Sequence, residues 1–409
     1  MADSDKDETF ALYFSTLFPT NSVFDFYSVY CDERPENREF CLEAEEWRRR
    51  FEEVASKDKL ASLVKTTRLR ALHAGAVYSD RVSFSRRSGV VAQHRELVFD
   101  LDLQDNPWVA GEKSDVEHND RFMPLLFASA NILKVALEQA FGFSQFMLVY
   151  SGRRGVHLYT LDIRGFKLTS EARKAICAFV SLPPRSTAGA ADTMGSPYLN
   201  TNLNPSLNIS EVHDAVDAAW TVATGTGEGM CDMLGSRVDI MRFAHLFTSW
   251  QDFHPRKKQD ENNDTNNRNN RNNLPPRRLP TAQNVIAELS QCSAEERLPR
   301  LARLNSYAAR DLAISIVWPR LDTEVTGNLL HTIKTPFSLH PATQRVALPL
   351  NVDACLLGWK PTDAALEAPA FAEGYRHGVD ILRGAVLEMR RNQRLEKKRG
   401  REQSAEVSW

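Results

Sequence analysis

The sequence has few cysteines and no excess of charge of either sign. Six cysteines in 409 residues are scattered along the chain without a C-x-x-C pair, and they are Cys31, Cys41, Cys177, Cys231, Cys292 and Cys355. This pattern excludes a disulfide scaffold and indicates a reducing, intracellular compartment. The 51 Lys and Arg against 53 Asp and Glu give a formal net charge of −2. A nucleic-acid partner would therefore need locally concentrated basic groups.

The sequence also lacks a long hydrophobic run. No segment reaches the roughly 18 apolar residues of a membrane helix, so no membrane association is expected. The first ten residues, MADSDKDETF, are acidic and polar, unlike a secretory signal or a mitochondrial presequence. The 42% hydrophobic and 25% charged residues exclude global disorder, and the length of 409 residues suits one large or two ordinary folded domains.

The periodicity of the apolar residues predicts an α/β (α+β) chain. Strands are expected at Val90–Leu103, Phe146–Ser151, Val156–Ile163 and Ile314–Asp322. Helices are expected at Phe10–Phe18, at Leu126–Phe141, from a Thr169 or Ser170 cap to Val180, and at Leu387–Glu402. The Asn-rich stretch 260–278 cannot bury apolar surface and is expected to be a disordered surface loop.

Two carboxylates stand at alternate positions of the first strand. Asp100 and Asp102 should project from one face, with Cβ atoms about 7 Å apart. Such a pair can hold one or two hard cations, as in-line phosphoryl or nucleotidyl transfer requires. Alone the D-x-D pattern is weak, because sugar-nucleotide transferases and ordinary surface strands also contain it.

A GRRG connection joins two of the apolar strands. Arg153 and Arg154 lie between glycines that let the backbone approach a ligand, so they could clamp a triphosphate in bidentate fashion. A solvent-facing hairpin with two arginines is the plain alternative. Farther along the chain Asp322 adds a third carboxylate, and Lys334 and His340 add groups that can bind phosphate.

These motifs, in this order, resemble one known family. The segments are Y-F-x-x-L-F-P, R-E-F, G-A-V-Y-S, R-E-L-V-F-D-L-D, V-Y-S-G-R-R-G-V-H, W-P-R-L-D and H-T-I-K-T-P-F-S-L-H-P. Between about residues 10 and 350 the chain resembles the catalytic small subunit of the eukaryotic and archaeal replicative DNA primase. The related primase-polymerases are less similar, because they typically carry Asp-x-Glu where this chain has Asp100-x-Asp102.

The resemblance implies a catalytic core of mixed β-sheet with flanking helices and an inserted helical subdomain. We expect residues 1–182 and 306–386 to form the two parts of the core, and residues 183–305 to form a mostly helical or irregular insertion. Residues 387–409 would be a basic tail, either solvated or acting as a nuclear-import signal.

The resemblance also implies roles for individual residues. Asp100, Asp102 and Asp322 would be catalytic and would hold two Mg²⁺ or Mn²⁺ ions. The triphosphate and ribose of the incoming nucleotide would be bound by Ser151, Arg153, Arg154, His157, Lys334 and His340. Arg50, or else Arg49, could also reach the nucleotide.

Two positions depart from the family pattern. A structural zinc site usually follows the D-x-D strand, but here residues 103–122 offer His118 and no cysteine, so zinc is expected to be absent. Distant cysteines such as Cys31, Cys41 or Cys231 could still converge on a zinc ion. The second departure is His73, which stands where we expect an acidic contact to the ribose, so the preference between ribonucleotides and deoxyribonucleotides is left open.

The implied activity is DNA-templated synthesis of short RNA primers from ribonucleoside triphosphates by two-metal nucleotidyl transfer. A single-stranded DNA template, an RNA primer, the large primase subunit and the DNA polymerase α complex would be the partners, in the nucleus. A primase-polymerase of damage tolerance and a degenerate scaffold subunit remain alternatives. A D-x-D glycosyltransferase would leave the GRRG segment without a role.

Overall fold

The computed structural model describes residues 3–85, 87, 89–106, 115–182, 205–224, 282–304, 306–351 and 359–406. The Asn-rich stretch 260–278 lies outside these ranges. The chain divides into two compact units, one formed by residues 1–181 with 319–409 and the other by residues 182–318. All of the expected site residues belong to the first unit.

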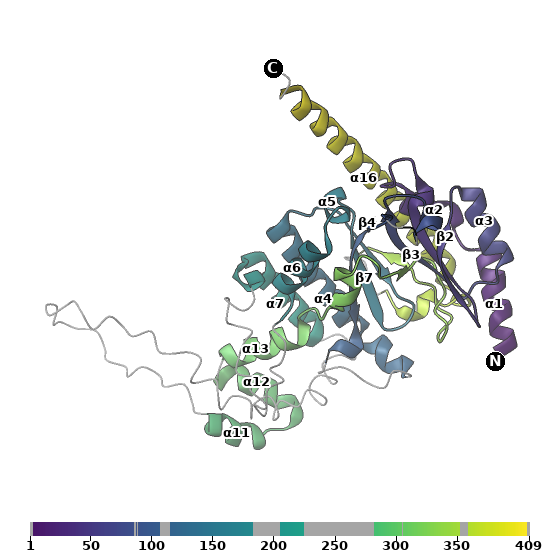
Figure 1. Cartoon of the computed structure of the whole chain (residues 1–409). Helices are drawn as coiled ribbons and strands as arrows, with labels where there is room; N and C mark the ends of the chain where they lie inside the picture. Colours follow the sequence, from purple (N-terminus) through teal and green to yellow (C-terminus); the bar gives the residue numbers. More distant parts are fainter. Residues whose placement is uncertain are drawn as a thin grey trace. The chain divides into compact units, whose positions relative to one another are not determined.

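Two antiparallel sheets form the centre of the first unit (Figure 1). Sheet A has the order β2-β1-β3-β4, with β8 also paired to β3, and its strands are β1 Arg38–Glu43, β2 Arg48–Glu53, β3 Ala71–Tyr78, β4 Ala92–His94 and β8 Ile333–Lys334. Sheet B has the order β5-β7-β6-β9, and its strands are β5 Leu97–Asp102, β6 Phe146–Tyr150, β7 Gly155–Thr160 and β9 Pro349–Leu350. The α+β class is confirmed, although the pairings between these strands are antiparallel and not mixed.

The register of sheet B fixes the position of the carboxylate pair. β5 pairs with β7 so that Asp100 lies opposite His157 and Asp102 lies opposite Gly155. The apolar face expected for this strand is confirmed, because Leu97, Phe99 and Leu101 are fully buried while both carboxylates are partly exposed. The strand is shorter than expected, since residues 92–94 form β4 in the other sheet.

Helices accompany both sheets. Those of the first unit are α1 Asp3–Thr16, α2 Thr20–Ser28, α3 Lys57–Thr66, α4 Val116–Phe141, α5 Ile163–Phe166, α6 Ser170–Val180, α14 Thr323–Gly327 and α16 Phe371–Glu406. Short 3₁₀ turns lie at η1 Pro35–Asn37, η2 Val82–Phe84, η3 Leu103–Asp105 and η6 Pro361–Ala364. None of the helices in the described part of the chain is long and apolar enough to cross a membrane.

The capping residues explain where several helices begin and end. Thr169 caps α6 through its side chain, as expected. α4 begins earlier than the apolar periodicity suggested, because Asp115 accepts a hydrogen bond from the backbone N–H of His118. It ends at Gly142, whose φ of 65° is the left-handed conformation that glycine tolerates.

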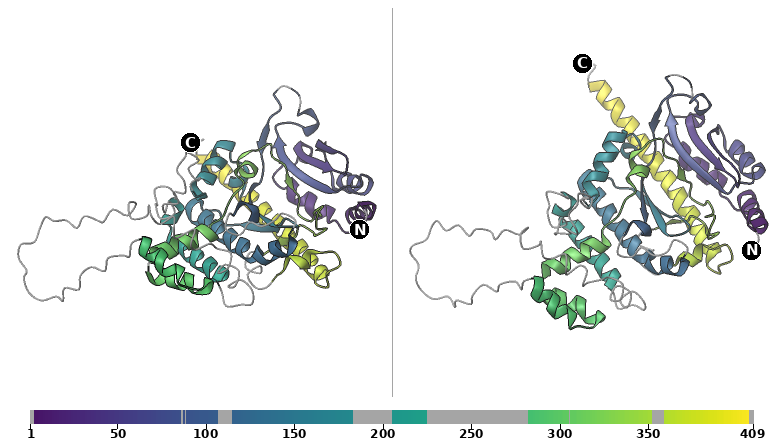
Figure 2. Two further views of the ribbon diagram at one scale, coloured as in Figure 1. Left: turned by 90° about the horizontal axis from the view of Figure 1, so that it is seen from below. Right: turned by 60° about the horizontal axis from the view of Figure 1, so that its bottom comes forward.

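The long helix α16 runs beside α2 and the strands β6 and β9 (Figure 2). Its helical character was expected, and part of its basic segment contacts the body of the unit. Arg390 forms an ion pair with Asp25 at 3.5 Å, and Lys397 lies 4.0 Å from Asp32. The basic segment is therefore partly docked and not wholly a solvated tail.

The segment that carries Asp322 follows the free edge of β5. The backbone N–H of Asp322 donates to the carbonyl of Asp100 at 3.1 Å, and the Thr326 hydroxyl donates to the carbonyl of Val98 at 2.9 Å. α14 thereby covers an edge that would otherwise present unpaired backbone groups.

Helices make up the regular structure described in the second unit. They are α7 Ser210–Thr224, α11 Ala282–Ser290, α12 Ala294–Leu304 and α13 Ser306–Val317, with a 3₁₀ turn η4 Pro205–Asn208. The predicted strand Ile314–Asp322 is wrong, because residues up to Val317 end α13 and Asp322 caps α14. Ile314, Ile316 and Val317 are fully buried, and such a short, wholly buried apolar run does not distinguish a helix from a strand.

Candidate active site

A cavity of about 590 Å³ opens in the first unit, and most of the expected site residues line it. One wall comes from sheet B and contributes Asp100, Asp102, Ser151, Gly155 and His157. The other comes from sheet A and contributes Arg48, Arg50, His73, Ile333 and Lys334. The segments around these strands complete the lining with Val325, Asn328, Leu330, His331, Thr332 and His340.

The sheet B wall carries unbalanced negative charge. Burial, together with the neighbouring carboxylates of Asp102 and Asp322, raises the pKa of Asp100 to about 7. His157 lies across the strand pair, with its Nε2 3.6 Å from Asp100 Oδ1. Burial and the nearby Lys334 lower the pKa of His157 to about 3, so its imidazole is neutral and does not offset the carboxylates.

Arg154 contacts the other carboxylate of the pair. Its Nε donates to both oxygens of Asp102, at 2.7 and 2.9 Å. Arg153 and Arg154 are adjacent to the cavity-lining Ser151 and Gly155 but are not themselves lining residues. The expected phosphate clamp is thus held next to the cavity, with one arginine bound to an acid.

Glycine is required in the connection between β6 and β7. Gly152 has a φ of 95°, and a Cβ atom at this position would lie 2.7 Å from the Cβ of His340. The close approach brings the hairpin against the segment that carries His340. At the end of the same connection, the Ser151 hydroxyl accepts a hydrogen bond from the backbone N–H of Gly155.

Asp322 lies beside the pair but does not complete a metal site. Its side chain is exposed and caps α14, accepting hydrogen bonds from the backbone N–H groups of Glu324 and Val325. Among the residues described here, no three His, Cys, Asp or Glu side chains are gathered closely enough to hold a metal ion. The Asp322 backbone is nevertheless bonded to that of Asp100, and its charge contributes to the raised pKa there.

On the sheet A wall, the guanidinium of Arg50 is held by a buried carboxylate. Arg50 forms an ion pair with the fully buried Glu39, at 2.6 and 3.0 Å, and also donates to the carbonyl of Leu330. Arg49, the other candidate on this strand, pairs with Glu52 at 2.9 Å and does not line the cavity. The structure therefore favours Arg50 as the group that can reach a ligand.

Lys334 and His340 reach the cavity from the last part of the core. Lys334 lies opposite His73 in the pair of β8 with β3, and burial lowers the pKa of its ammonium group. Burial and three cations, Lys334 first among them, lower the pKa of His340 to about 3. Between them Phe337 adopts a φ of 68°, and the hydroxyl of Tyr13 donates to its carbonyl at 2.7 Å.

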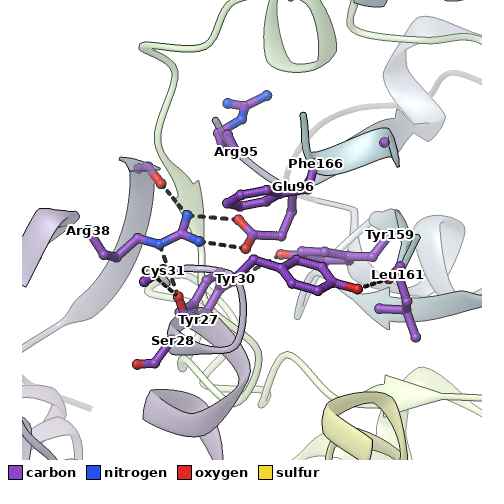
Figure 3. A network of polar contacts seen from close by, with 12 residues as sticks. Tyr27, Ser28, Tyr30, Cys31, Arg38, Arg95, Glu96, Tyr159, Leu161 and Phe166 are labelled. Atoms are coloured by element: carbon purple, nitrogen blue, oxygen red, sulfur yellow. Dashed lines mark hydrogen bonds and ion pairs between the residues drawn. The ribbon is translucent and has the colours of Figure 1, made fainter. Parts of the chain in front are cut away.

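A buried ion pair links strand β1 of sheet A to the residue that precedes β5 of sheet B (Figure 3). Arg38, the first residue of β1, donates to both oxygens of Glu96, which precedes β5, at 2.9 and 2.7 Å. Arg38 also donates to the carbonyls of Tyr27 and Gly75. Because the guanidinium makes these four hydrogen bonds, the pair can fix one wall relative to the other.

The motif analysis missed several residues of the cavity. Arg48, Asn328, His331 and Thr332 line it, and Glu39 and Glu43 hold the cations and the imidazole of the sheet A wall. Arg48 and Arg50 alternate along one strand, which was an available signal for a shared face. The partners Glu39 and Glu43 come from a different strand, and only the register of β1 with β2 and β3 brings them there.

The stretch expected to have lost zinc is described only in part, because residues 107–114 lie outside the described ranges. His118 lies in the first turn of α4, and its ring packs at a tilt of 53° against Phe122 with 4.8 Å between centroids. Cys231 also lies outside the described residues. The absence of zinc remains a prediction.

The fold and the cavity define an α+β protein with paired carboxylates facing a wall of cations. A sequence profile of the DNA primase small subunit matches residues 99–352, which include the sheet B wall and, from the sheet A wall, Ile333 and Lys334. The chain therefore belongs to the DNA primase small subunit family.

Curated relatives agree with this assignment. The DNA primase small subunit of Schizosaccharomyces pombe is 25% identical over 291 residues, covering 68% of this chain and 58% of that protein. The Saccharomyces cerevisiae DNA primase small subunit is 23% identical over 355 residues, covering 83% and 80%. The DNA primase small subunit PriS of Thermococcus onnurineus is 32% identical over 127 residues, covering 30% and 34%. This chain thus spans less than two thirds of the S. pombe relative.

Proposed function

We propose that the chain is a DNA primase that synthesises short RNA primers on a single-stranded DNA template by nucleotidyl transfer. The observation that carries the proposal is the cavity, where Asp100 and Asp102 face the cationic wall of sheet A. Family membership supports the same activity. The reaction joins the 3′-hydroxyl of one nucleotide to the α-phosphate of the next and releases pyrophosphate.

Asp100, Asp102 and Asp322 fit divalent cations chemically. Their oxygen donors suit Mg²⁺ or Mn²⁺, and the pKa of Asp100 is raised first by burial and then by the neighbouring carboxylates, whose charge a cation would relieve. When bound, such ions would stabilise the attacking and leaving oxygens of the displacement. The side chain of Asp322 would have to leave its helix-capping position to join the other two carboxylates.

The remaining residues would bind and orient the nucleotide. Arg154 can exchange Asp102 for phosphate oxygens, and Arg153, Lys334 and Arg50 add positive charge around the cavity. The neutral imidazoles of His157 and His340 can donate or accept hydrogen bonds without adding charge. Ser151 contributes a hydroxyl at the end of the same hairpin.

The alternatives differ in substrate and in activity. A primase-polymerase of damage tolerance would accept deoxyribonucleotides readily, and a scaffold subunit would incorporate neither kind. Incubation of the purified chain with a single-stranded template, Mn²⁺ and labelled ribonucleotides or deoxyribonucleotides separates them. We expect ribonucleotide products; products from deoxyribonucleotides alone would favour the first alternative, and no products would favour the second.

Metal content and partners complete the proposal. We propose that the large primase subunit and the DNA polymerase α complex are the partners and that the chain acts in the nucleus. We also propose that it holds no structural zinc. Elemental analysis after dialysis against a chelator tests the last point, since about one equivalent of zinc would show a site built from other residues.

A further inference from the structure

A series of polar contacts leads from helix α4 to the GRRG turn, residues 152–155. The carboxylate of Asp120 on α4 accepts two hydrogen bonds from the guanidinium of Arg345, at 2.6 and 2.8 Å. The same guanidinium donates to the hydroxyl of Tyr150 at 3.4 Å, and this hydroxyl donates to the carbonyl of Arg153 at 3.0 Å. Asp120, Arg345 and Tyr150 are not cavity-lining residues, so they can act on a ligand only through the turn.

The chemistry of these groups fixes the direction of each hydrogen bond. Burial opposes the charge of Arg345, but the hydrogen bonds with Asp120 and Tyr150 outweigh it and raise the pKa of the guanidinium above its ordinary value. Burial raises the pKa of Tyr150, so its hydroxyl keeps its proton. Because a guanidinium has no acceptor, the tyrosine oxygen accepts from Arg345, and its proton is left for the carbonyl of Arg153.

Three successive carbonyls of the GRRG turn are held by hydrogen bonds. That of Gly152 accepts from the hydroxyl of Thr343 at 2.6 Å, and that of Arg154 accepts from the backbone N–H of Leu103 at 3.2 Å. The carbonyl between them is the one that accepts from the tyrosine hydroxyl. It belongs to the planar peptide group that leads into Arg154. The tyrosine therefore fixes the orientation of the backbone from which the Arg154 side chain departs.

The backbone of Arg345 contacts the turn from a second side. Its carbonyl accepts a hydrogen bond from the N–H of His340 at 2.9 Å, and a Cβ atom at Gly152 would lie 3.0 Å from the same oxygen. Arg345 thus touches both the GRRG turn and the segment that carries His340 into the cavity. Because Asp120 holds its side chain, Arg345 can keep these two parts of the site at a fixed spacing.

We infer that Asp120, acting through Arg345 and Tyr150, is a positioning residue that holds the GRRG turn in the orientation in which Arg154 binds a triphosphate. The inference rests on the proposed function. Bidentate binding of phosphate by a guanidinium needs a defined geometry, and a displacement of about 1 Å caused from outside the site is enough to impair it. The hydrogen bonds of Tyr150 transmit the constraint, so removal of its hydroxyl should release the turn.

The experiment measures the dissociation constant of one ribonucleoside triphosphate, with Mn²⁺, for the purified full chain and its variants. Tyr150→Phe removes the hydroxyl without changing any charge, and Asp120→Asn removes the carboxylate charge that holds Arg345. Glu138→Gln is the matched control, because Glu138 lies on the same helix, pairs with Lys134 at 3.6 Å and does not line the cavity. Thermal unfolding of each variant verifies that it is folded at the temperature of the titration.

Each substitution is also made together with Arg154→Gln. Loss of a purely structural contact would weaken binding by the same factor whether or not the arginine is present, whereas a positioning residue loses its effect once the group that it positions is gone. We expect Tyr150→Phe and Asp120→Asn each to weaken binding about five- to tenfold alone and less than about twofold in the presence of Arg154→Gln. Glu138→Gln should bind as wild type does.

An affinity within about twofold of wild type in Tyr150→Phe would overturn the inference. Equal losses with and without Arg154→Gln would also overturn it, because the hydroxyl would then act on another group. An unchanged affinity in well-folded Asp120→Asn would overturn the role of Asp120. A wild-type chain that binds no triphosphate would refute both the inference and the proposed function. If it binds the triphosphate but incorporates no nucleotide, the proposed function fails while the titrations still decide the inference.

Discussion

The two walls of the cavity carry their charges in opposite ways. On the sheet B wall, burial and then the neighbouring carboxylates raise the pKa of Asp100 to about 7. On the sheet A wall Arg50 is paired with the buried Glu39, and His73 with Glu43. A divalent cation would relieve the crowded charge of the first wall, whereas Arg50 and His73 of the second wall are already paired with the protein's own carboxylates.

This difference in charge pairing suits the sheet B wall to chemistry and the sheet A wall to recognition of a ligand. Unbalanced carboxylates cost stability, and a fold keeps them where they bind a metal or take part in chemistry. Cations neutralised by buried acids cost less and hold fixed positions, as recognition of a ligand requires. The ion pair of Arg38 with Glu96 connects the walls and holds both arrangements in register.

Loss of an acid on the sheet B wall should have the largest effect. We expect Asp100→Asn to lower nucleotide incorporation by about a thousandfold or more, because a metal-binding carboxylate contributes several kcal/mol to transition-state stabilisation. Folding should be preserved, since the change removes a crowded charge. Primer synthesis and thermal unfolding measure the two effects.

Asp58→Asn is the matched control for this variant, because Asp58 is an exposed residue in the first turn of α3 and lies outside the cavity. It should behave as wild type. More than about a tenth of wild-type activity in well-folded Asp100→Asn protein would contradict the claim that the carboxylates of the sheet B wall carry the chemistry.

Substitution of Arg154 tests what its ion pair with Asp102 contributes to metal and nucleotide binding. Arg154→Gln releases Asp102, so Mn²⁺ should bind more tightly without nucleotide, while the nucleotide itself should bind about tenfold or more weakly. Arg154→Lys should restore nucleotide binding only in part, because an ammonium group lacks the bidentate fork. Separate titrations of Mn²⁺ and of the nucleotide measure the two affinities. Equal affinities in all three proteins would show that Arg154 contributes to the binding of neither ligand.

The stability of the sheet A wall should be sensitive to a larger side chain at Gly75. A Cβ atom there would lie 2.5 Å from Oε2 of Glu39, which is fully buried and held by Arg50. We expect Gly75→Ala to lower the free energy of unfolding by about 2 kcal/mol, as overpacking usually does, and to weaken nucleotide binding through Arg50. Urea unfolding and nucleotide titration measure the two effects.

Gly384→Ala provides the comparison, since nothing lies within 4 Å of a Cβ atom at that position of α16. It should be neutral or stabilising by about 0.5 to 1 kcal/mol, because alanine favours the helix. Equal effects of the two substitutions would show that Glu39 does not hold a fixed position.

The smallest expected effect is on the pH dependence of stability. The pKa of Asp100 is about 7 in the folded protein against 3.8 for an unperturbed carboxyl group. Between these values the folded chain binds more protons than the unfolded one, so the contribution of Asp100 makes stability fall as the pH rises from about 4 to 7.

The difference in unfolding free energy between Asp100→Asn and wild type should therefore grow across this range and then level off. We expect about 1 to 2 kcal/mol, because the side chain is 25% exposed and solvent screens it. Urea unfolding in the presence of a chelator at several pH values measures the difference. A constant difference would mean that the pKa of Asp100 is not raised in the folded protein.

The sequence predicted the sheet B wall better than the sheet A wall. The D-x-D strand, the strand–GRRG–strand hairpin and the Thr169 cap are local patterns, and the structure has each of them. The sheet A wall collects Arg50, His73 and Lys334 from three separate strands. Their carboxylate partners follow from strand register, which a single sequence does not specify.

The error at residues 314–322 has a related cause. A wholly buried helix and a buried strand have the same apolar composition, and tertiary packing decides between them. The structure brings the backbone of Asp322 to Asp100, but its side chain caps α14, which its motif did not predict.

The measurement that tests the central claim most directly is binding of a ribonucleoside triphosphate, in the presence of Mn²⁺, to wild type and to Lys334→Gln. Lys334 belongs to the sheet A wall and lines the same cavity as Asp100 and Asp102. If both walls hold one nucleotide, loss of this cation should weaken binding by about tenfold or more while the thermal stability changes little. An unchanged dissociation constant would contradict the account, because the cationic wall would then take no part in binding the nucleotide.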